Sequence, residues 1–485
     1  MHNKFLLVIF FFLLFSFVFS ACGTTIDATD QPSRSTRTPT STKKATSSSS
    51  SKPTRTPIST PEPVSKLGAT SEDLDGTEIE IWHSWSGLAG DKFDRLIKDF
   101  SETNEWNIDV ESRYQGDYDQ TYENLSLSFE DGPRPDVVIG YNYQALGLDA
   151  SEEVFVDLEA YIDDPVWGYK EDKRSDFIPV FWDQNITEDN HIGIPAQGSG
   201  QLLYYNQTWA EELGYDTPPT TPAEFKRQAC AASRKNIQDE DPTNDKTGGW
   251  IISTDYSGML GWLYAFGGEI TKPDGEGYQF NTQEVEDALT FLRDLYDDGC
   301  AWLSDSQIPE SEFANRQGLF ATGSVAGIPH QEAAFVNADS KDEWTVIPFP
   351  SSDGEPVIDV YGPSFQVLKT DETEQLASWL LIKWLTSPEN QAVLSQATGF
   401  FPVRQSSLEH LDILPRTYPQ WAEAVDLLSM ARSEPSYPSW RTVRWAVSDA
   451  ATQLYRYYFT IDQVPSLTRL LDRTANDLHN PTEDQ

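Results

Sequence analysis

Basic residues are scarce in this chain: 35 Lys and Arg stand against 77 Asp and Glu, and the formal net charge is −42. So acidic a surface repels phosphate backbones, which excludes a nucleic-acid-binding protein. The sequence also lacks an HExxH motif, a phosphate-binding GxxxxGK[ST] loop and a GxSxG nucleophile elbow. Carboxylate pairs arise by chance in such a composition and do not identify a glycosidase. We therefore expect no enzyme, no metal site and no cofactor. The stretch "DEDPTNDKTGG" at residues 239–249 lacks the spacing of a calcium loop, so we expect an acidic surface loop there, and a structural calcium ion is the alternative.

Long apolar runs are also few, and the run at residues 5–19 contains 15 residues, which suits a signal peptide better than a membrane-spanning helix. It ends in "FSACG", which resembles the lipobox of bacterial lipoproteins, although Phe19 replaces the usual leucine. We expect residues 1–21 to be a signal peptide and Cys22 to be lipidated, which would anchor the chain to a membrane. The alternative is a simple secretory signal with an incidental cysteine.

A Ser/Thr/Pro-rich tract follows Cys22, and we assign residues 22–75 to a disordered tether. Residues 23–70 hold seven basic and three acidic residues; without these and Lys4, the rest holds 27 basic and 74 acidic residues, a net charge of −47. A basic tether beside an acidic body suits an anionic membrane surface. A plain solvated linker is the alternative.

Cysteine is nearly absent from the remainder, which contains only Cys230 and Cys300. Outside the cytoplasm these two residues could form a disulfide and close a loop of about 70 residues. The alternative is two buried free thiols.

The body has the length of two lobes and begins with alternating strands and helices. "TEIEIW" alternates with period two, "DKFDRLIKDF" has helical spacing, "NIDVESRY" alternates again, and "PDVVIG" is typical of a buried parallel strand. This order predicts an open α/β sheet, whose ligands bind beyond the carboxyl ends of the strands.

Aromatic residues are abundant (12%), and several follow directly after these predicted strands. These strand ends carry Trp82, His83 and Trp85, then Tyr114, Gln115 and Tyr118, then Tyr141, Asn142 and Tyr143. An aromatic ring offers a flat face to a sugar, and amides hydrogen-bond its hydroxyl groups. We expect these side chains to face a ligand, the alternative being core packing.

The chain resembles extracellular solute-binding proteins of family 1, the sugar-binding components of ABC importers. The resemblance covers nearly all of residues 76–405. It depends on "IEIWHSWSG", "PDVVIG", "IGIPAQGSGQLLYYNQTWAEELGYDTPPTTPAEF", "GWLYAFGGEI", "RQGLFATGSVAGIP" and "GPSFQVLKTDETEQLASWLLIKWLTSPENQAVLSQATGFFPVR", in this order.

The resemblance implies an α/β protein with a two-lobed, type II periplasmic-binding-protein-like fold, in which open, doubly wound sheets are joined by hinge crossovers. We expect residues 76–196 plus 349–386 to form lobe 1, and residues 197–348 plus 387–485 to form lobe 2.

Matching the motifs residue by residue, the resemblance implies that the binding site lies between the lobes. It adds these residues to the strand-end aromatics: Gln197, Ser199, Trp262, His330, Tyr361, Gly362, Ser364, Arg404 and Trp440. Core packing is the alternative for Trp262, a strand-end cap for His330, an ion pair for Arg404 and backbone hydrogen bonding for Ser364.

These observations favour a monomeric, extracytoplasmic lipoprotein that captures a mono- or oligosaccharide and delivers it to an ABC permease. A polyol or glycerol phosphodiester is an alternative ligand, although a phosphate needs several convergent cations. The chain could instead be a secreted polysaccharide-active enzyme, or a sugar sensor that signals through a membrane receptor.

Overall fold

The computed structural model describes residues 63–187, 190–306 and 309–481, which belong to one compact unit beginning at Glu62. The predicted signal peptide, Cys22 and most of the predicted tether lie outside the described residues. The end of the tether differs from the expectation, because Ser65 Oγ donates to Asp164 at 3.0 Å and Leu74 is buried. No helix of these described segments has the length and apolar character that crossing a membrane requires.

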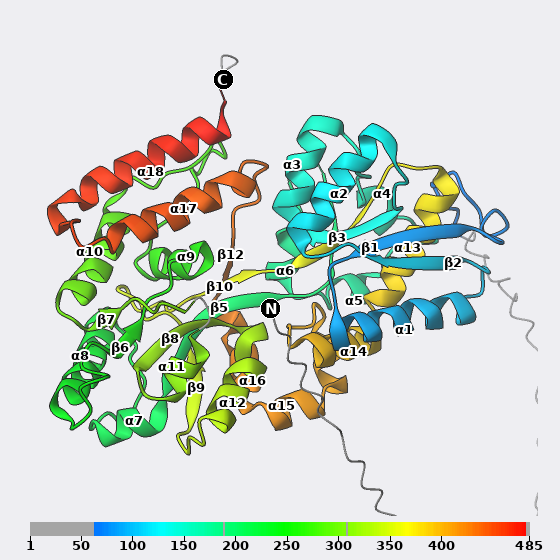
Figure 1. Ribbon diagram of the computed structural model, residues 1–485. Helices are drawn as coiled ribbons and strands as arrows, with labels where there is room; N and C mark the ends of the chain where they lie inside the picture. Colours follow the sequence, from blue (N-terminus) through cyan, green and yellow to red (C-terminus); the bar gives the residue numbers. More distant parts are fainter. Residues whose placement is uncertain (1–62, 188–189, 307–308, 482–485) are drawn as a thin grey trace, which may run out of the picture. The chain divides into compact units, whose positions relative to one another are not determined.

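The first lobe contains a five-stranded sheet with the order β2-β1-β3-β11-β4 (Figure 1). Its strands are β1 (Glu78–His83), β2 (Asp109–Tyr114), β3 (Val137–Tyr141), β4 (Ile194–Pro195) and β11 (Pro363–Val367). β1 pairs in parallel with β2 and β3, as the sequence predicts, whereas β11 is antiparallel to β3 and β4. The residues of β3 up to Gly140 are buried, in accordance with the continuous apolar run.

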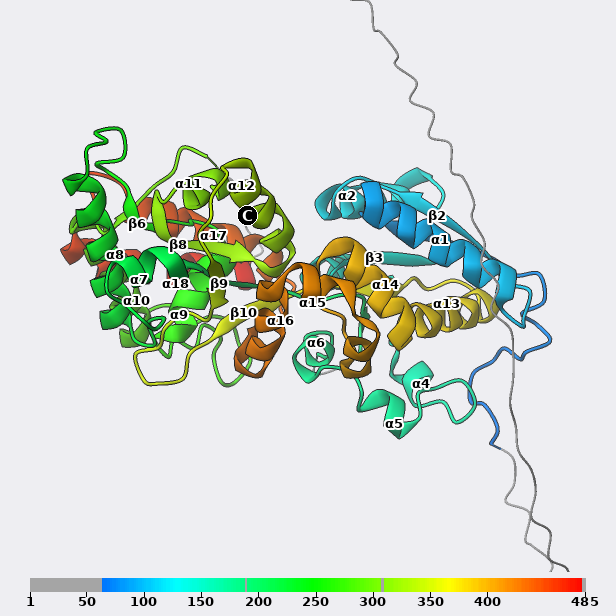
Figure 2. The ribbon, with the colours of Figure 1, turned by 90° about the horizontal axis from the view of Figure 1, so that it is seen from below.

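The helices of the first lobe cover this sheet, and α1 packs against α14 in both ribbon views (Figure 2). α1 buries Phe93, Leu96, Ile97 and Phe100, the residues at helical spacing. The helices are α1 (Gly87–Thr103), α2 (Tyr118–Asp131), α3 (Asn142–Glu152), α4 (Glu159–Ile162), α5 (Glu171–Arg174), α6 (Pro179–Asp183), α13 (Glu372–Leu385), α14 (Pro388–Thr398) and η2 (Gln405–His410).

The second lobe contains a seven-stranded sheet with the order β12-β10-β5-β8-β6-β7, and β9 also pairs with β5. Its strands are β5 (Ser199–Asn206), β6 (Gly248–Ile251), β7 (Ala301–Trp302), β8 (Gly318–Ser324), β9 (Trp344–Ile347), β10 (Ile358–Tyr361) and β12 (Ala431–Ser433).

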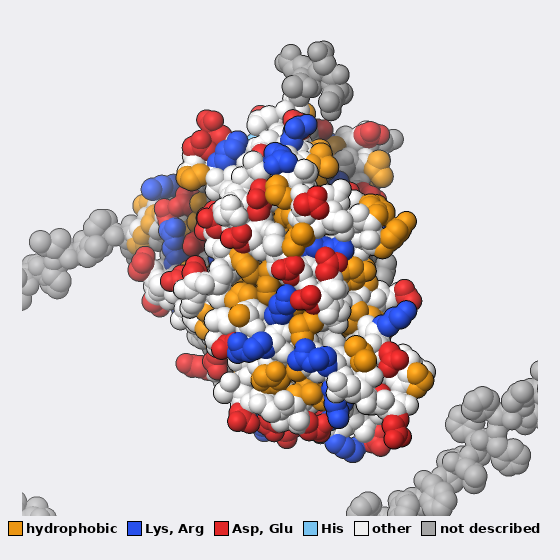
Figure 3. All heavy atoms as spheres, turned by 90° about the vertical axis from the view of Figure 1, so that its left-hand side faces the viewer, with side chains coloured by type: hydrophobic (Ala, Val, Ile, Leu, Met, Phe, Trp, Pro, Cys, Tyr) orange, Lys and Arg blue, Asp and Glu red, His pale blue; other side chains and the backbone are white. Residues whose placement is uncertain are grey.

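The helices of the second lobe include a C-terminal pair, α17 and α18, which pack against each other (Figure 1). The helices are α7 (Gln207–Glu212), α8 (Pro222–Gln238), α9 (Tyr256–Ala265), α10 (Gln283–Asp297), α11 (Glu310–Ala314), η1 (Val325–Gly327), α12 (Ile328–Asn337), α15 (Ile413–Thr417), α16 (Pro419–Asp426), η3 (Leu427–Met430), α17 (Trp440–Leu454), η4 (Ile461–Gln463) and α18 (Val464–His479). Figure 3 shows the outer face of this lobe, where basic, acidic and hydrophobic side chains are mixed.

The lobe boundaries differ from the expected ones at two places. Residues 349–361 were expected in the first lobe, but β10 pairs with β5 and β12 in the second sheet. α14 was expected in the second lobe, but it packs on α1 of the first. The first difference arises from strand pairing and the second from helix packing, and both are contacts between segments that are distant in sequence, which no local pattern specifies.

The chain crosses between the lobes at Gln197–Gly198, at Gly362 and a third time between η2 and α15; the first two crossings lie close together. A Cβ atom at Gly362 would lie 2.1 Å from the Gln197 carbonyl oxygen, and a Cβ atom at Gly198 would lie 2.2 Å from the Phe181 ring. The segments around Gln197 and Gly362 therefore lie so close together that only glycine fits at position 362.

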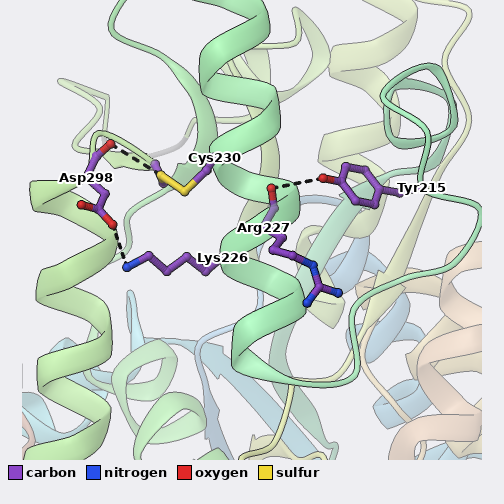
Figure 4. The surroundings of a disulfide bond; sticks show 6 residues. Tyr215, Lys226, Arg227, Cys230 and Asp298 are labelled. Carbon is purple, nitrogen blue, oxygen red and sulfur yellow. Dashed lines mark hydrogen bonds and ion pairs between the residues drawn. A yellow bond between two sulfur atoms is a disulfide. The ribbon is translucent and has the colours of Figure 1, made fainter.

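Cys230 and Cys300 form a disulfide in the second lobe (Figure 4). The bond joins α8 to the residue that precedes β7, and the ion pair between Lys226 and Asp298 lies beside it, with an N–O distance of 2.7 Å. It therefore links two segments whose positions along the chain are 70 residues apart.

Candidate functional site

Three of the tyrosines predicted to bind ligand come together between the lobes. Tyr141 ends β3 in the first lobe; its ring centroid lies 4.9 Å from that of Tyr118 and 6.3 Å from that of Tyr361, which ends β10 in the second lobe. All three residues are partly buried. The strand ends of both sheets thus present aromatic faces to the same place, as expected for open α/β sheets.

Arg444 of α17 joins these tyrosines and contacts both lobes. Its Nη1 donates to the Tyr143 hydroxyl at 2.6 Å and to the Tyr256 hydroxyl at 3.1 Å, and its Nη2 lies 3.3 Å from the Asp119 carboxylate. The guanidinium also lies over the Tyr143 ring at 4.5 Å. α2 and α3 supply the first-lobe partners, and α9 supplies Tyr256. We call Tyr118, Tyr141, Tyr143, Tyr256, Tyr361 and Arg444 the inter-lobe cluster.

Carboxylates surround this cluster in addition to Asp119. Glu434 accepts from Ser257 Oγ at 2.9 Å and from Trp440 Nε1 at 2.8 Å. Burial raises the pKa of Glu434 to about 7, and burial also raises the pKa of Asp255, the N-cap of α9. A single buried arginine therefore faces several acidic groups, so the site favours neutral hydroxylated or cationic ligands over anions.

Several predicted residues place buried polar atoms at the lobe crossing. Gln197 Oε1, Ser199 Oγ and Ser364 Oγ are buried and have no hydrogen-bond partner among the described residues. Gln201, whose Nε2 lies 3.4 Å from the Tyr361 hydroxyl, likewise leaves its Oε1 without a partner in that part of the chain. Buried polar atoms normally have partners, so these atoms depart from the usual pattern at the point where the chain crosses between the lobes.

Asn142 and Gly362 hold the crossing together. Asn142 Nδ2 donates to the Gln184 carbonyl at 2.5 Å and to Ser436 Oγ of the second lobe at 3.2 Å. The Gly362 carbonyl lies 3.5 Å from Gln184 Nε2. These contacts give both residues a positioning role at the crossing.

Trp82 and His83, the last two residues of β1, and Trp85, just after it, were expected to face a ligand, but all three are buried. Trp82 Nε1 donates to the Glu80 carboxylate, and Trp85 packs edge-on against Phe93 with centroids 4.9 Å apart. The His83 ring lies 4.8 Å from the same phenylalanine. These neighbours explain the positions of all three side chains by core packing rather than by ligand contact.

Four further predicted residues lie outside the inter-lobe cluster. Trp262 is 1% exposed in the core of the second lobe, and Trp440 is 0% exposed beneath Glu434. Arg404 is buried in the first lobe, where its Nη1 donates to the Lys173 carbonyl at 2.6 Å. His330 is exposed on α12. Trp262 and Trp440 are used for packing, whereas Arg404 forms an ion pair with Asp176, with an N–O distance of 3.6 Å.

Sequence reasoning placed Tyr143 at a strand end but did not select Tyr256 and Arg444, which complete the cluster, nor Trp445, which is 52% exposed beside it. One signal was available for Arg444. It lies four residues after Trp440, one helical turn along "WRTVRW", and therefore on a similar face of α17.

A metal site finds no support in the part of the chain that the structure describes, where no group of three or more His, Cys, Asp or Glu side chains could hold an ion.

Comparison with protein families decides the identity of the chain. The family model described as "bacterial extracellular solute-binding protein" matches residues 95–466, more than half of the chain. The chain belongs to the bacterial extracellular solute-binding proteins. The family that the sequence resemblance indicated is thereby confirmed, and its members are binding proteins that act outside the cytoplasm.

Individual relatives of this solute-binding protein are distant. The sn-glycerol-3-phosphate-binding periplasmic protein UgpB of Salmonella typhimurium is 23% identical over 367 residues, which cover 71% of this chain and 78% of the relative.

Solved structures confirm the two-lobed fold. The cyclic alpha-maltosyl-1,6-maltose binding protein of Arthrobacter globiformis is 21% identical, with a TM-score of 0.68 and coverage of 84% of this chain and 100% of that chain. UgpB of Mycobacterium tuberculosis, solved with glycerophosphocholine, is 19% identical, with a TM-score of 0.67 and coverage of 82% and 98%.

The buried His83 of this solute-binding protein gives a pH-dependent prediction. Burial lowers the pKa of His83 to about 4, against an ordinary value of 6.5. Between these values the unfolded chain binds a proton that the folded chain excludes, so this residue destabilises the fold as the pH falls. His83→Gln removes that cost, and the free energy of unfolding of the variant relative to the wild type should rise by about 2 kcal/mol from pH 7 to pH 5.

Urea unfolding at both pH values measures this difference. The wild type and the variant must be compared at each pH because Glu434 changes the stability in the opposite direction. Its pKa is raised to about 7, so the folded chain binds a proton that the unfolded chain has lost, and Glu434 stabilises the fold as the pH falls. Exposed His330 supplies the matched control, since His330→Gln should leave the difference unchanged. Parallel pH profiles of wild type and His83→Gln would disprove the burial argument.

Proposed function

We propose that this solute-binding protein captures a mono- or oligosaccharide at the inter-lobe cluster and delivers it to the permease of an ABC importer, without altering it. The observation that carries the proposal is the set of partly buried tyrosines drawn from both lobes around Arg444. Aromatic faces bind the apolar face of a sugar ring, and the unpartnered amide and hydroxyl groups bind its rim.

The mechanism follows from the contacts that cross the lobes. A ligand that touches Tyr141 of the first lobe and Tyr361 of the second makes both contacts only when the lobes are together. Its affinity for the closed arrangement therefore exceeds that for the open one, and this difference drives closure.

A glycerol phosphodiester is the second candidate, because relatives of similar sequence are named glycerol-3-phosphate-binding proteins. Arg444 could bind its phosphate. The charges around Arg444 favour the saccharide, however, because carboxylates repel a phosphate. Burial raises the pKa of Glu434 to about 7, so Glu434 is partly charged at neutral pH, and Asp119 and Asp255 lie close to Arg444.

Lipid anchoring through Cys22, a monomeric state and docking to a permease belong to the same proposal. The lipobox-like "FSACG" supports the lipid anchor, and membership of an extracellular solute-binding family supports docking to a permease. Cys22→Ser should release the protein from membranes into the medium, which fractionation of cells that produce either form measures. Equal membrane association of both forms would remove the lipid anchor from the proposal.

The decisive experiment is a thermal-shift screen with mono- and oligosaccharides, glycerol 3-phosphate and glycerophosphocholine, followed by calorimetry. A saccharide should raise the melting temperature and remain chemically unchanged. Tyr141→Ala should weaken its binding about 30-fold, since a lost aromatic contact in an enclosed site costs about 2 kcal/mol. The matched control is Tyr457→Ala, which removes a tyrosine that is 89% exposed.

The outcome distinguishes the candidates. Binding of a phosphodiester but no saccharide would replace the proposed ligand, and hydrolysis of the saccharide would identify an enzyme instead. Equal affinities of wild type and Tyr141→Ala would remove the inter-lobe cluster from the site.

A further inference from the structure

Two neighbouring tyrosines are exposed at the turn between α17 and α18. Tyr457 is 89% exposed and Tyr458 is 57% exposed, whereas Tyr455 and Phe459 on either side are buried. In both ribbon views this turn forms the end of the second lobe that lies farthest from the first lobe (Figure 1, Figure 2). α17 continues for ten residues after Arg444, roughly 15 Å at the helical rise, so this tyrosine pair lies outside the inter-lobe cluster.

Arg293 of α10 braces the turn from the interior of the lobe. Its Nη1 donates to the Leu454 carbonyl at 2.8 Å and to the Arg456 carbonyl at 3.0 Å, and the residue is 4% exposed. Its Nη2 lies 2.5 Å from an Asp297 carboxylate oxygen, and its guanidinium lies 5.8 Å from the centroid of the Phe459 ring. Hydrogen bonds from a charged, buried donor are strong, so the backbone before the tyrosine pair and the ring after it are held in place.

The two rings of the pair present their faces to solvent in different directions. Their centroids lie 5.2 Å apart and their planes meet at 80°, an edge-to-face contact. Rings on a braced turn lose little conformational entropy when a ligand stacks on them, since a tyrosine side chain has only two rotatable angles. The turn therefore displays two preorganised aromatic faces that the described part of the chain leaves largely uncovered.

The side chains around the pair are mostly polar, and their charges cancel. Arg456 and Asp462 are exposed and have opposite charges, and Thr460 and Gln463 are exposed and uncharged. Ile461, which is 38% exposed, supplies aliphatic surface. Figure 3 faces this end of the lobe, where hydrophobic side chains lie among charged ones of both signs. A ligand that binds here is therefore expected to be neutral and to combine an apolar face with polar groups.

This composition distinguishes a sugar polymer from the other partners of exposed aromatic rings. An anionic membrane attracts clusters of basic residues, whereas the turn has no net charge and the body is strongly acidic. A protein-binding hot spot is surrounded by contacts that exclude water, whereas the neighbours of this pair are polar and exposed. A pyranose ring has an apolar face for stacking and hydroxyl groups for these polar neighbours.

We propose that Tyr457 and Tyr458 bind a neutral polysaccharide on the surface of the second lobe, at a site separate from the one between the lobes. Their ring spacing of 5.2 Å is close to the length that one pyranose unit adds to an extended chain, so successive units can stack on successive rings. The outer end of the lobe leaves room for a long polymer (Figure 1). Such binding holds the protein on a polymer without any movement of the lobes, and it does not depend on the proposed function.

Affinity electrophoresis of the purified full-length protein in native gels that contain glycogen, arabinoxylan or hydroxyethyl cellulose tests the site. At least one of these polymers should retard the wild type, and Tyr457→Ala/Tyr458→Ala should bind that polymer about 10-fold more weakly, since both stacking faces are lost. Tyr457→Phe/Tyr458→Phe keeps both ring faces and should bind within about 3-fold of the wild type. The matched control is Leu470→Ala, which removes a side chain of α18 that is 58% exposed and should leave the retardation unchanged.

Tyr141→Ala separates the two sites, because it alters the inter-lobe cluster and should leave the retardation by the polymer unchanged. Loss of retardation in Tyr141→Ala would assign the polymer to the inter-lobe cluster and overturn the surface site. Absence of retardation by all three polymers, or equal retardation of the wild type and the double alanine variant, would also overturn it. Failure of every saccharide in the thermal-shift screen would refute the proposed function while the polymer still bound the tyrosine pair.

Sedimentation with vesicles of phosphatidylcholine and phosphatidylglycerol tests the membrane as the partner instead. The Cys22→Ser form is used, because it excludes a contribution from the proposed lipid anchor, and it should remain in the supernatant. Sedimentation with the vesicles that Tyr457→Ala/Tyr458→Ala abolishes would identify a membrane-binding turn and overturn the polysaccharide site. A short saccharide gains little from two exposed rings, so Tyr457→Ala should still leave binding at the inter-lobe cluster unchanged.

Discussion

Arg444→Ala is expected to weaken ligand binding about 100-fold. Arg444 donates to Tyr143 of the first lobe and Tyr256 of the second and pairs with Asp119, and it is 6% exposed. Loss of these contacts removes about 2–3 kcal/mol that stabilises the closed arrangement, and the open arrangement gains population accordingly. Isothermal titration with the saccharide from the screen measures the change.

Two further variants show whether the geometry of the guanidinium matters. Arg444→Lys keeps the charge but cannot donate to three partners from one plane, so its affinity should lie between those of wild type and Arg444→Ala. Arg473→Ala removes an arginine of α18 outside the cluster and should leave the affinity unchanged. A loss of less than about 3-fold in Arg444→Ala would show that the lobes close without this residue.

Removal of the Cys230–Cys300 disulfide is expected to lower the melting temperature by about 10 °C. The bond closes a loop of 70 residues, and the chain-entropy model gives such a loop a stabilisation of about 4 kcal/mol. Differential scanning calorimetry of Cys230→Ala/Cys300→Ala, with the wild type as reference, measures the effect.

Reduced wild type is the control for lost packing, because it keeps both sulfur atoms. Its melting temperature should fall by nearly as much as that of the double variant. A reduced protein that melts at the temperature of the oxidised one would show that the cross-link contributes nothing. Ligand affinity at low temperature should be unchanged, because both cysteines belong to the second lobe and lie outside the inter-lobe cluster.

Part of the site was predictable from the sequence. Tyr118 and Tyr141 come after predicted strands, where ligands of open α/β sheets bind, and the structure brings Tyr141 to 4.9 Å from Tyr118 and 6.3 Å from Tyr361 between ring centroids. Tyr361 came from the family resemblance rather than from a pattern, because β10 is only four residues long and pairs with strands that are far away in sequence. Their role in ligand binding remains a prediction.

The same rule placed Trp82, His83 and Trp85 at a strand end, and they are buried there. A tryptophan at a strand end can turn toward a cleft or toward the helix that covers the sheet, and Phe93 of α1 fills the space beside His83 and Trp85. Local sequence does not distinguish these directions, because the strand pattern fixes where the residue lies but not which neighbour its side chain packs against.

The sequence by itself determined the order of strands and helices in the first lobe, the acidic character of the body and the membership in a solute-binding family. It did so because periodicity, charge and motif order are local properties of the chain. Only the tertiary structure decided which aromatic rings meet between the lobes and that Arg444 reaches Asp119 and Tyr143, some 300 residues earlier. The physical reason is that such contacts depend on how two sheets and a C-terminal helix pack, and no local preference specifies that packing.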